Sequence, residues 1–171
     1  MIQYSSANTP VGLIYLAQHG QELCSLALGI AAEAKLLGYL ADQFPGVEVC
    51  QSEIELIPAV NQLNEYFAGE RTSFELPIRV EGTDFQRKVW RELLQIPYGV
   101  TRSYGEIANK LGSPGGMRAV GAANGQNPLP IIVPCHRVIA ADGSLGGYTG
   151  GLDIKHKLLE LERQKFTPTL F

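Results

Sequence analysis

Short apolar runs alternate with turn residues along the N-terminal part of the chain. The runs at residues 2–5, 13–17 and 23–28 are rich in strand-forming side chains and predict three strands. Asn8-Thr9-Pro10 and His19-Gly20 are typical of the turns between strands. Because these connections are short, the pattern predicts an antiparallel meander.

The spacing of apolar residues then becomes helical. Residues 31–44 have the composition of a helix, which Pro45-Gly46 ends. Residues 47–51 are a candidate for a fourth strand at the edge of the sheet. A second helix is predicted where apolar residues recur at helical intervals, at Ile57, Val60, Leu63 and Phe67.

A change in character separates the two halves of the chain. Residues 70–82 contain Pro77 and Gly82 and predict either a strand or a linker. We therefore place a domain boundary in this segment, with one domain at residues 1–78 and a second at residues 79–171.

Helix signals dominate the second half. Thr83-x-x-Gln86 and Ser103-x-x-Glu106 are capping boxes, each typical of the first turn of a helix. After the first box, Phe85, Val89 and Leu93 form one apolar stripe, and a last helix is predicted at residues 153–163.

Two short helices are predicted after the second capping box, at residues 104–111 and 116–123. Gly112-Ser113-Pro114-Gly115 joins them as a tight turn, so the pair is a candidate helix-turn-helix. A helical hairpin without any binding role has the same pattern, and the spacing leaves both readings open. The whole chain predicts an α+β protein, with an N-terminal three-stranded antiparallel sheet and helices, followed by a mostly helical C-terminal domain that contains the helix-turn-helix.

Charge is divided unevenly along the 171 residues, although the net charge is only −3. Residues 1–83 hold three basic and ten acidic side chains, a net charge of −7. Residues 84–171 hold eleven basic and seven acidic side chains, a net charge of +4. Such asymmetry is expected when one half meets a polyanion, although a solvated basic face has the same composition.

The cysteines and the apolar content indicate the type of compartment. Cys24, Cys50 and Cys135 are widely spaced and form no CxxC pair, so neither a disulfide framework nor a metal site is indicated. No apolar stretch is as long as a membrane span, and the first residues lack a secretory pattern. We expect a cytoplasmic protein with reduced thiols, without a membrane association and without a metal.

The segment Pro134-Cys135-His136 carries the strongest chemical signal. A cysteine is reactive as its thiolate, and a neighbouring imidazole is a usual means of forming one. A glycine-rich segment at residues 146–151 follows, where backbone can approach a flat ligand closely. The pattern favours a nucleophilic cysteine, while a small buried structural cysteine is the alternative.

Two further features of the second half call for a partner. Small side chains at Ala119, Gly121 and Ala122 follow Arg118 and allow close approach of another backbone, either a nucleic acid or a second helix. Glu162 lies near the end of the last predicted helix, where the helix dipole disfavours a carboxylate. It is therefore expected to have a specific partner, unless it is simply exposed.

Taken together, these motifs resemble the O6-alkylguanine-DNA alkyltransferases. The resemblance covers about 80 residues, and the first half resembles the family, with its ribonuclease H-like N-terminal domain, only in length and in its strand-rich start. The motifs occur in the family's order: Phe85-Gln86-x-x-Val89-Trp90, Ser103-Tyr104-Gly105, Arg118-Ala119-Val120-Gly121, Asn127-Pro128, Pro134-Cys135-His136-Arg137-Val138 and Gly147-Tyr148-x-Gly150-Gly151.

The resemblance implies a DNA repair protein that acts on duplex DNA. Its substrate is O6-alkylguanine, together with O4-alkylthymine, and the base must be flipped out of the stack to be reached. Arg118 fills the vacated stack, Tyr104 crowds the phosphate, and Ala119, Gly121 and Ala122 lie in the minor groove, where binding is largely independent of sequence. A monomer is expected, and cooperative binding along DNA is left open.

The resemblance also implies a role for each residue of the active site. Cys135 attacks the alkyl carbon, and His136 acts as the base through a water because adjacent residues on an extended chain point in opposite directions. Glu162 orients the imidazole, Asn127 ties its turn to the cysteine loop, and Tyr104 protonates the departing guanine.

The guanine pocket is implied at Val138, Gly147, Tyr148 and Thr149. Thr149 stands where some relatives have serine, so tolerance of bulky adducts is an open question. A thioether is stable, so the protein acts once and needs no cofactor. Some relatives hold a zinc ion in the first domain, and only Cys24, Cys50 and His19 are available for one here, so no metal is carried over.

Three other readings compete with this one. A cysteine hydrolase needs donors aimed at an oxyanion, and no sequence element supplies them. A lesion sensor of the same fold lacks the acceptor cysteine, which this chain has. A DNA-binding regulator has no use for the set Asn127, His136 and Glu162.

Overall fold

The computed structural model describes residues 1–166, with side chains described as far as residue 164. The chain divides into two compact units, and the boundary lies between Glu81 and Gly82. The sequence-based boundary between residues 78 and 79 lies just before this point.

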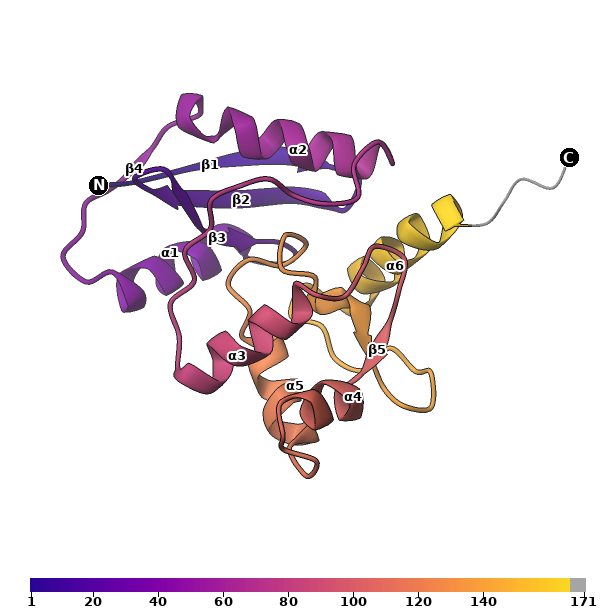
Figure 1. Ribbon diagram of the computed structural model, residues 1–171. Coiled ribbons are helices and arrows are strands. Elements are labelled where there is room, and N and C mark those ends of the chain that lie inside the picture. Colours follow the sequence, from indigo (N-terminus) through magenta and orange to yellow (C-terminus); the bar gives the residue numbers. More distant parts are fainter. Residues whose placement is uncertain (167–171) are drawn as a thin grey trace, which may run out of the picture. The chain divides into compact units, whose positions relative to one another are not determined.

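The first unit is built on a four-stranded sheet (Figure 1). Strands β1 (Ile2–Thr9), β2 (Gly12–His19) and β3 (Glu22–Ala27) form the expected antiparallel meander. Strand β4 (Val49–Gln51) pairs in parallel with β1, which gives the order β3-β2-β1-β4. The first two strands are longer than their apolar runs, because backbone pairing continues through polar residues up to the tight turns.

The other edge of the sheet is closed by the segment that the sequence left as strand or linker. The Leu23 amide donates to the Pro77 carbonyl at 2.8 Å, and the Arg79 amide donates to the Leu23 carbonyl at 2.9 Å. This isolated bridge pairs the backbone of Leu23 at the edge of β3 without forming a further regular strand.

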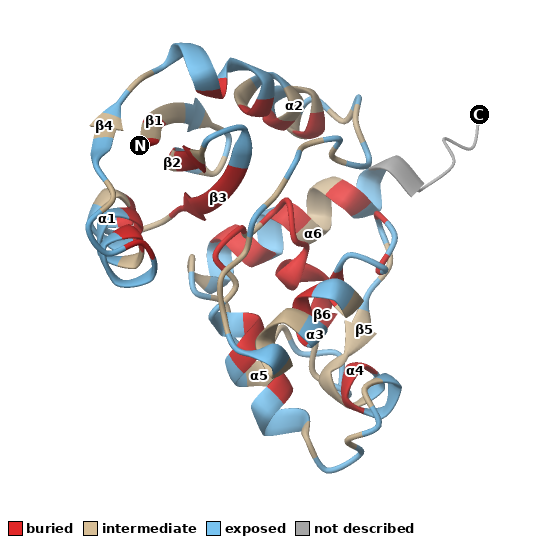
Figure 2. Cartoon of the chain, turned by 60° about the vertical axis from the view of Figure 1, so that its left-hand side comes forward, coloured by how far each residue is buried: buried red, intermediate tan, exposed pale blue. Residues whose placement is uncertain are grey.

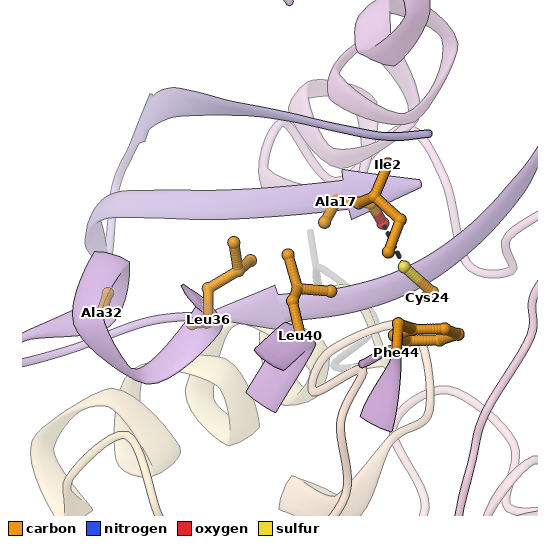
Figure 3. Packing of buried hydrophobic residues seen from close by; sticks show 8 residues of the cluster. Ile2, Ala17, Cys24, Ala32, Leu36, Leu40 and Phe44 are labelled. Atoms are coloured by element: carbon orange, nitrogen blue, oxygen red, sulfur yellow. Dashed lines mark hydrogen bonds between the residues drawn. The ribbon is translucent and has the colours of Figure 1, made fainter. Parts of the chain in front are cut away.

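Helices cover the two faces of this sheet (Figure 1). Helix α1 (Ala32–Gln43) buries Ala32, Leu36 and Leu40 on one face. They pack with Ile2, Ala17, Cys24, Ala27 and Phe44 (Figure 3), where the Cys24 thiol donates to the Ala17 carbonyl at 3.4 Å. A short 3₁₀ turn, η1 (Ile54–Leu56), leads into helix α2 (Ile57–Phe67), which buries Ala59, Leu63 and Tyr66 against the opposite face.

The second unit is mostly helical, as expected. Both capping boxes are confirmed: Thr83 and Gln86 exchange hydrogen bonds at the start of α3 (Asp84–Leu93), and Ser103 and Glu106 at the start of α4 (Tyr104–Lys110). Helix α3 buries Val89, Trp90 and Leu93, while the side chain of Phe85 is only half-buried.

Helices α4 and α5 (Met117–Gly125) form the expected pair of short helices. The last helix, α6 (Leu152–Phe166), extends beyond its predicted end and buries Ile154 and Leu158. Figure 2 shows that its buried positions lie along one side, whereas α5 is largely exposed.

The chain around Cys135 is not extended, contrary to the expectation for Cys135 and His136. The chain reverses at Ile131, which has a positive φ of 76°, and residues Cys135–Arg137 form a 3₁₀ turn, η2. The prolines remove three amide donors, but several of the remaining amides find carbonyls within the same segment: Val133 N donates to Leu129 O, and Arg137 N to Pro134 O. Prolines thus exclude a central strand without requiring an extended chain.

The sequence also gave no sign of a second, smaller sheet. Strand β5 (Arg102–Ser103) pairs in parallel with β6 (Val138–Ile139), which directly follows η2. The pair is too short for a periodic pattern, yet it fixes the cysteine turn against the entrance to α4.

Core packing in the first unit is open to a direct test with adjacent leucines. Leu36 is fully buried beneath the sheet and Leu37 is partly exposed on the same helix. We expect Leu36→Ala to lower the free energy of unfolding by about 2–5 kcal/mol, because it removes buried contacts and leaves a cavity. Leu37→Ala should cost less than about 1 kcal/mol. Urea unfolding of the full chain, followed by circular dichroism, measures both, and equal losses would contradict this packing.

Candidate active site

Two asparagines hold the turn that carries Cys135. The Asn124 side chain on α5 donates to the Cys135 carbonyl at 3.2 Å. Asn127 donates to the Val133 carbonyl at 2.8 Å and accepts from the Leu129 amide at 3.0 Å. The end of α5 is therefore tied to the cysteine turn at two points, and Cys135 is held almost fully buried.

His136 and Glu162 form the pair that the family resemblance implies. The imidazole Nε2 lies 2.7 Å from a carboxylate oxygen of Glu162, and both side chains are fully buried. Glu162 therefore has a specific partner, and the alternative of an exposed glutamate is wrong. An ionised carboxylate only accepts, so Nε2 carries the hydrogen and Nδ1 is left as an acceptor. No partner for Nδ1 is present among the described residues.

Arg137 completes this cluster. Its guanidinium binds both oxygens of Glu162, with the closest contact at 2.9 Å, and donates to the Ile96 carbonyl at 2.6 Å. The Gly99 amide donates to the same carboxylate at 3.1 Å. A buried carboxylate thus receives several charged or polar donors, which is what burial of a charge requires.

The electrostatics of the cluster keep the carboxylate charged and the imidazole neutral. Burial by itself raises the pKa of Glu162, but the hydrogen bonds from His136 and Arg137 and the positive charge of Arg137 outweigh it and lower that pKa to about 2. Burial lowers the pKa of His136; the bond to Glu162 opposes this shift, and the charges of Arg137 and Lys155 add to it. The imidazole is therefore a base ready to accept a proton.

The thiol of Cys135 is not a thiolate in this resting structure, contrary to the simplest expectation from its histidine neighbour. Burial raises its pKa to about 11, although Asn127, Lys155 and Tyr148 each act to lower it. The imidazole is not among the groups that lower this pKa. Reaction at Cys135 consequently requires removal of a proton as part of the chemical step.

Lys155 is a charged residue of the site that the sequence did not reveal. It lies on α6 with no exposed surface. Its ammonium donates to the carbonyls of Val138, Leu145 and Gly147 at 2.7, 2.5 and 3.1 Å. Three donors meet three acceptors, so the ammonium is satisfied even though burial lowers its pKa to about 8.

An open cavity of about 630 Å³ lies beside this cluster. Tyr104, Arg118, Asn124, Tyr148 and Thr149 contribute to its lining. Tyr148 connects the cavity to the cysteine: burial raises the pKa of its hydroxyl well above the usual value, and the neighbouring Cys135 adds to the shift. Thr149 donates to the Gly125 carbonyl at 2.6 Å, which ties the cavity wall to α5.

Position 146, in the same wall of the cavity, has room only for a glycine. Its φ is +69°, and a Cβ there would lie 2.8 Å from the Tyr104 hydroxyl. Tyr104 in turn packs on Gly121 of α5, where a Cβ would lie 3.8 Å from the ring. Small residues at these two points allow the tyrosine to sit between α5 and the glycine-rich segment.

The structure brings together most of the residues that the sequence selected. Gly147, Tyr148 and Thr149 line the cavity, whereas Val138 is completely buried and is not part of the lining. On α5, Arg118, Ala119 and Ala122 are exposed, while Gly121 is half-buried beneath Tyr104.

Arg137, Lys155 and Asn124 were missed as site residues. Arg137 stands between His136 and Val138, so a charge inside an otherwise buried motif was a usable signal. Lys155 follows Ile154 on the inner side of the last helix, where its position next to a buried residue was the only indication.

Other kinds of site find little support within residues 1–166. This part of the chain has no group of three or more His, Cys, Asp or Glu side chains placed to hold a metal ion. Its helices are also too short or too polar to span a membrane.

Comparison with known families is decisive for the whole chain. The family model described as 6-O-methylguanine DNA methyltransferase, DNA binding domain, matches residues 84–164. The model of the ribonuclease-like domain of the same methyltransferase matches residues 2–80. The chain belongs to the 6-O-methylguanine DNA methyltransferase family. The resemblance inferred from the motifs is confirmed, and it extends over both units.

Relatives of this methyltransferase family match over nearly the full length. The methylated-DNA–protein-cysteine methyltransferase of Mycobacterium tuberculosis is 50% identical over 166 residues, which are 96% of this chain and 94% of the relative. The inducible enzyme of Bacillus subtilis is 39% identical over 92% of this chain and 83% of its own. A crystal structure of the Mycobacterium tuberculosis protein OGT in complex with DNA matches with a TM-score of 0.83 and 47% identity, covering 95% of this chain and 94% of that one.

The buried cluster makes a prediction for this member of the methyltransferase family. We expect Glu162→Gln to lower the free energy of unfolding by about 3–5 kcal/mol at neutral pH, because it leaves Arg137 buried without a counter-charge. Glu160→Gln, on an exposed ion pair with Arg163, is the matched control and should have little effect.

The pH dependence of this difference is fixed by the direction of the pKa shift. The folded pKa of Glu162 lies at about 2, below its usual value, so its stabilisation is complete above about pH 5 and is lost as the pH falls through about 2. Urea unfolding across this range should show the gap between wild type and Glu162→Gln closing in acid. A gap independent of pH would contradict an ionised Glu162.

Proposed function

We propose that this protein repairs alkylated duplex DNA by moving an alkyl group from the O6 atom of guanine, or the O4 atom of thymine, to its own Cys135. The observation that carries this proposal is a cysteine held beside a neutral, buried imidazole and next to an open cavity. The family of the chain and the names of its relatives support the same activity.

The chemistry is a single displacement at carbon. The sulfur of Cys135 forms a bond to the alkyl carbon while the bond between that carbon and the base oxygen breaks, and the base leaves with the electron pair. The thiol proton goes to His136 Nδ1, directly or through a water molecule, and Glu162 stabilises the imidazolium that forms. Tyr104 on the cavity wall supplies a proton to the departing guanine.

The buried cluster suits this sequence of proton transfers. Nε2 is already bonded to Glu162, so the free Nδ1 is the atom that accepts. The product is a thioether, which no group of the site is able to cleave. The protein therefore acts once, without a cofactor, and is consumed by its own reaction.

DNA is bound by the second unit, through α5 and the exposed Arg118. We place the small residues Ala119, Gly121 and Ala122 in the minor groove, where their contacts distinguish poorly between base sequences. Arg118 also lines the cavity, so it stands at the place from which a base is flipped and fills the gap in the stack. We propose a monomer in the cytoplasm, with cooperative binding along DNA left to measurement.

Mass spectrometry of the intact protein tests the transfer. After incubation with a duplex that contains one O6-methylguanine, we expect a mass gain of about one methylene, located on the Cys135 peptide and limited to one equivalent. Cys135→Ala should show no gain but retain binding to DNA, because the thiol is buried and contributes little contact surface.

Cys50→Ala is the matched control, because Cys50 is a half-buried cysteine in the first unit. It should react like the wild type. Alkyl transfer to the Cys135→Ala variant would contradict the proposed mechanism. Tight binding to the lesion without any mass change would favour a lesion sensor. If the protein neither bound the lesion nor gained mass, Cys135 would be a structural residue.

Arg118 has a separate prediction, which depends on base flipping. Arg118→Ala should slow transfer from duplex DNA by about tenfold or more, yet affect a single-stranded oligonucleotide much less, because only the duplex requires extrusion of the base. Arg91→Ala, an exposed arginine on α3, serves as the control for a general loss of positive charge. Single-turnover rates on the two substrates provide the measurement, and equal losses on both would contradict the role of Arg118.

A further inference from the structure

The first unit has a cavity of its own. It measures about 270 Å³ and is formed by the end of β2, the start of β3, the start of α2 and the segment that follows α2. Gln18, Gln21 and Glu55 supply the polar part of its wall. The apolar part consists of Leu23, Pro58, Ala59, Leu76 and Pro77. A cavity of this size is slightly smaller than the sites that take drug-sized ligands, and it suits a single side chain.

Hydrogen bonds fix the outer wall of this cavity, which is the segment after α2. At one end the Glu75 amide donates to the Gln62 side chain on α2 at 2.9 Å, and Gln62 donates back to the Glu75 carbonyl at 3.1 Å. At the other end Pro77 and Arg79 bond to Leu23 at the edge of β3. The cavity is therefore formed in the free protein, and a ligand has little ordering to bring about when it binds.

Gln18 is out of place in its strand. Ile14, Leu16 and Gln18 follow one another on one face of β2, and the two apolar residues are completely buried. Gln18 is only 8% exposed, at a position where the alternation calls for an apolar residue. Its side-chain amide has no hydrogen-bond partner among the described residues, and the cavity is its route to solvent. An amide in this position is costly unless a partner reaches it, so it points to a ligand in the cavity.

Glu55 makes the cavity negative. Its carboxylate forms no ion pair with the described residues. The first unit has three basic side chains against ten acidic ones. Arg71 and Arg79 are paired with other glutamates, and Lys35 lies on α1, which covers the other face of the sheet. The basic side chains of the first unit thus leave Glu55 uncompensated, and a positively charged ligand suits the cavity.

An arginine side chain matches these features. Its methylene stem packs on the apolar wall, and its guanidinium offers only donors, which the carboxylate of Glu55 and the amide oxygen of Gln18 accept. A guanidinium is less strongly hydrated than the ammonium of lysine, so it enters a largely apolar pocket more readily. The start of α2 has no side-chain cap and by itself favours an anion, but the carboxylate of Glu55 opposes one.

The surface around Glu55 indicates where the arginine comes from. Ile54 and Ile57 lie in the same stretch of chain as Glu55 and Pro58, and they are 75% and 51% exposed. Two large apolar side chains exposed next to a charged pocket are typical of a surface that another protein covers. We propose that the cavity binds an arginine side chain of a partner protein, whose neighbouring apolar residues cover Ile54 and Ile57. The interaction does not depend on the alkyl-transfer chemistry.

A titration of the full chain, followed by two-dimensional NMR of its backbone amides, tests the pocket. The probe is arginine blocked at both ends, and blocked citrulline is its uncharged analogue of the same shape. We expect saturable shifts at Gln18, Gln21 and Glu55, with a dissociation constant of about 1–10 mM for a ligand of this size. Blocked citrulline should bind about fivefold more weakly or less, because it lacks the charge that Glu55 attracts.

Substitutions in the wall locate the contacts. Glu55→Gln should weaken binding of blocked arginine about fivefold and abolish the preference over citrulline. Gln18→Leu should weaken it about three- to tenfold, because the hydrogen bond to the amide is lost. Glu53→Gln is the matched control, since Glu53 is an exposed glutamate close by that is not part of the lining. It should bind like the wild type, and urea unfolding verifies that each variant is folded.

A tripeptide separates a protein partner from a free guanidinium compound. Acetyl-Leu-Arg-Leu-amide should bind about tenfold more tightly than blocked arginine, because its leucines cover exposed apolar surface. Ile54→Ser should remove most of this gain and leave the affinity for blocked arginine unchanged.

Each contrary result has a definite meaning. The proposal is overturned if blocked arginine does not shift these amides, if citrulline binds equally well, or if Glu55→Gln and Gln18→Leu both keep the wild-type affinity. A tripeptide that binds no more tightly than blocked arginine would exclude the protein partner and leave a pocket for small guanidinium compounds. Shifts of the same amides that depend on protein concentration alone would show that the occupant is a second copy of this chain instead.

Discussion

The arrangement of the second unit depends on burying one ionised carboxylate. Glu162 has almost no exposed surface, and a charge in that position is tolerated only if donors surround it. The donors come from separate parts of the chain: His136 and Arg137 from the cysteine turn, and the Gly99 amide from the loop after α3. Satisfying this charge therefore fixes α6 against the turn that carries Cys135, and with it the geometry of the reaction.

The same burial keeps the site unreactive until it is needed. The pKa of the Cys135 thiol is raised to about 11, so the reactive thiolate is scarce near neutral pH. The neutral imidazole of His136 has one nitrogen committed to Glu162 and the other unpaired. Reactivity consequently depends on a proton transfer, and not on a thiolate that is always present.

Large side chains and glycines together shape the cavity beside the cysteine, with Tyr104, Arg118 and Tyr148 next to Gly121 and Gly147 in its lining. The buried ammonium of Lys155 donates to the carbonyls of Val138, Leu145 and Gly147. It thereby holds residues 138–147 against α6. Gly146 leaves room for the Tyr104 hydroxyl. The segment that forms the wall thus contains a buried ammonium whose three donors are matched by three carbonyls.

Local patterns in the sequence determined much of this protein. The meander, both capping boxes and the paired short helices follow from turns, caps and spacing, because these depend on neighbouring residues. The pairing of His136 with Glu162, 26 residues apart, was implied by the family resemblance. The tertiary structure alone decided that the cysteine turn is a 3₁₀ helix paired through β6, that Arg137 shares the carboxylate, and that Lys155 and Asn124 face the site. Those features arise from contacts between segments distant in the chain, and such contacts leave no periodic or local signal.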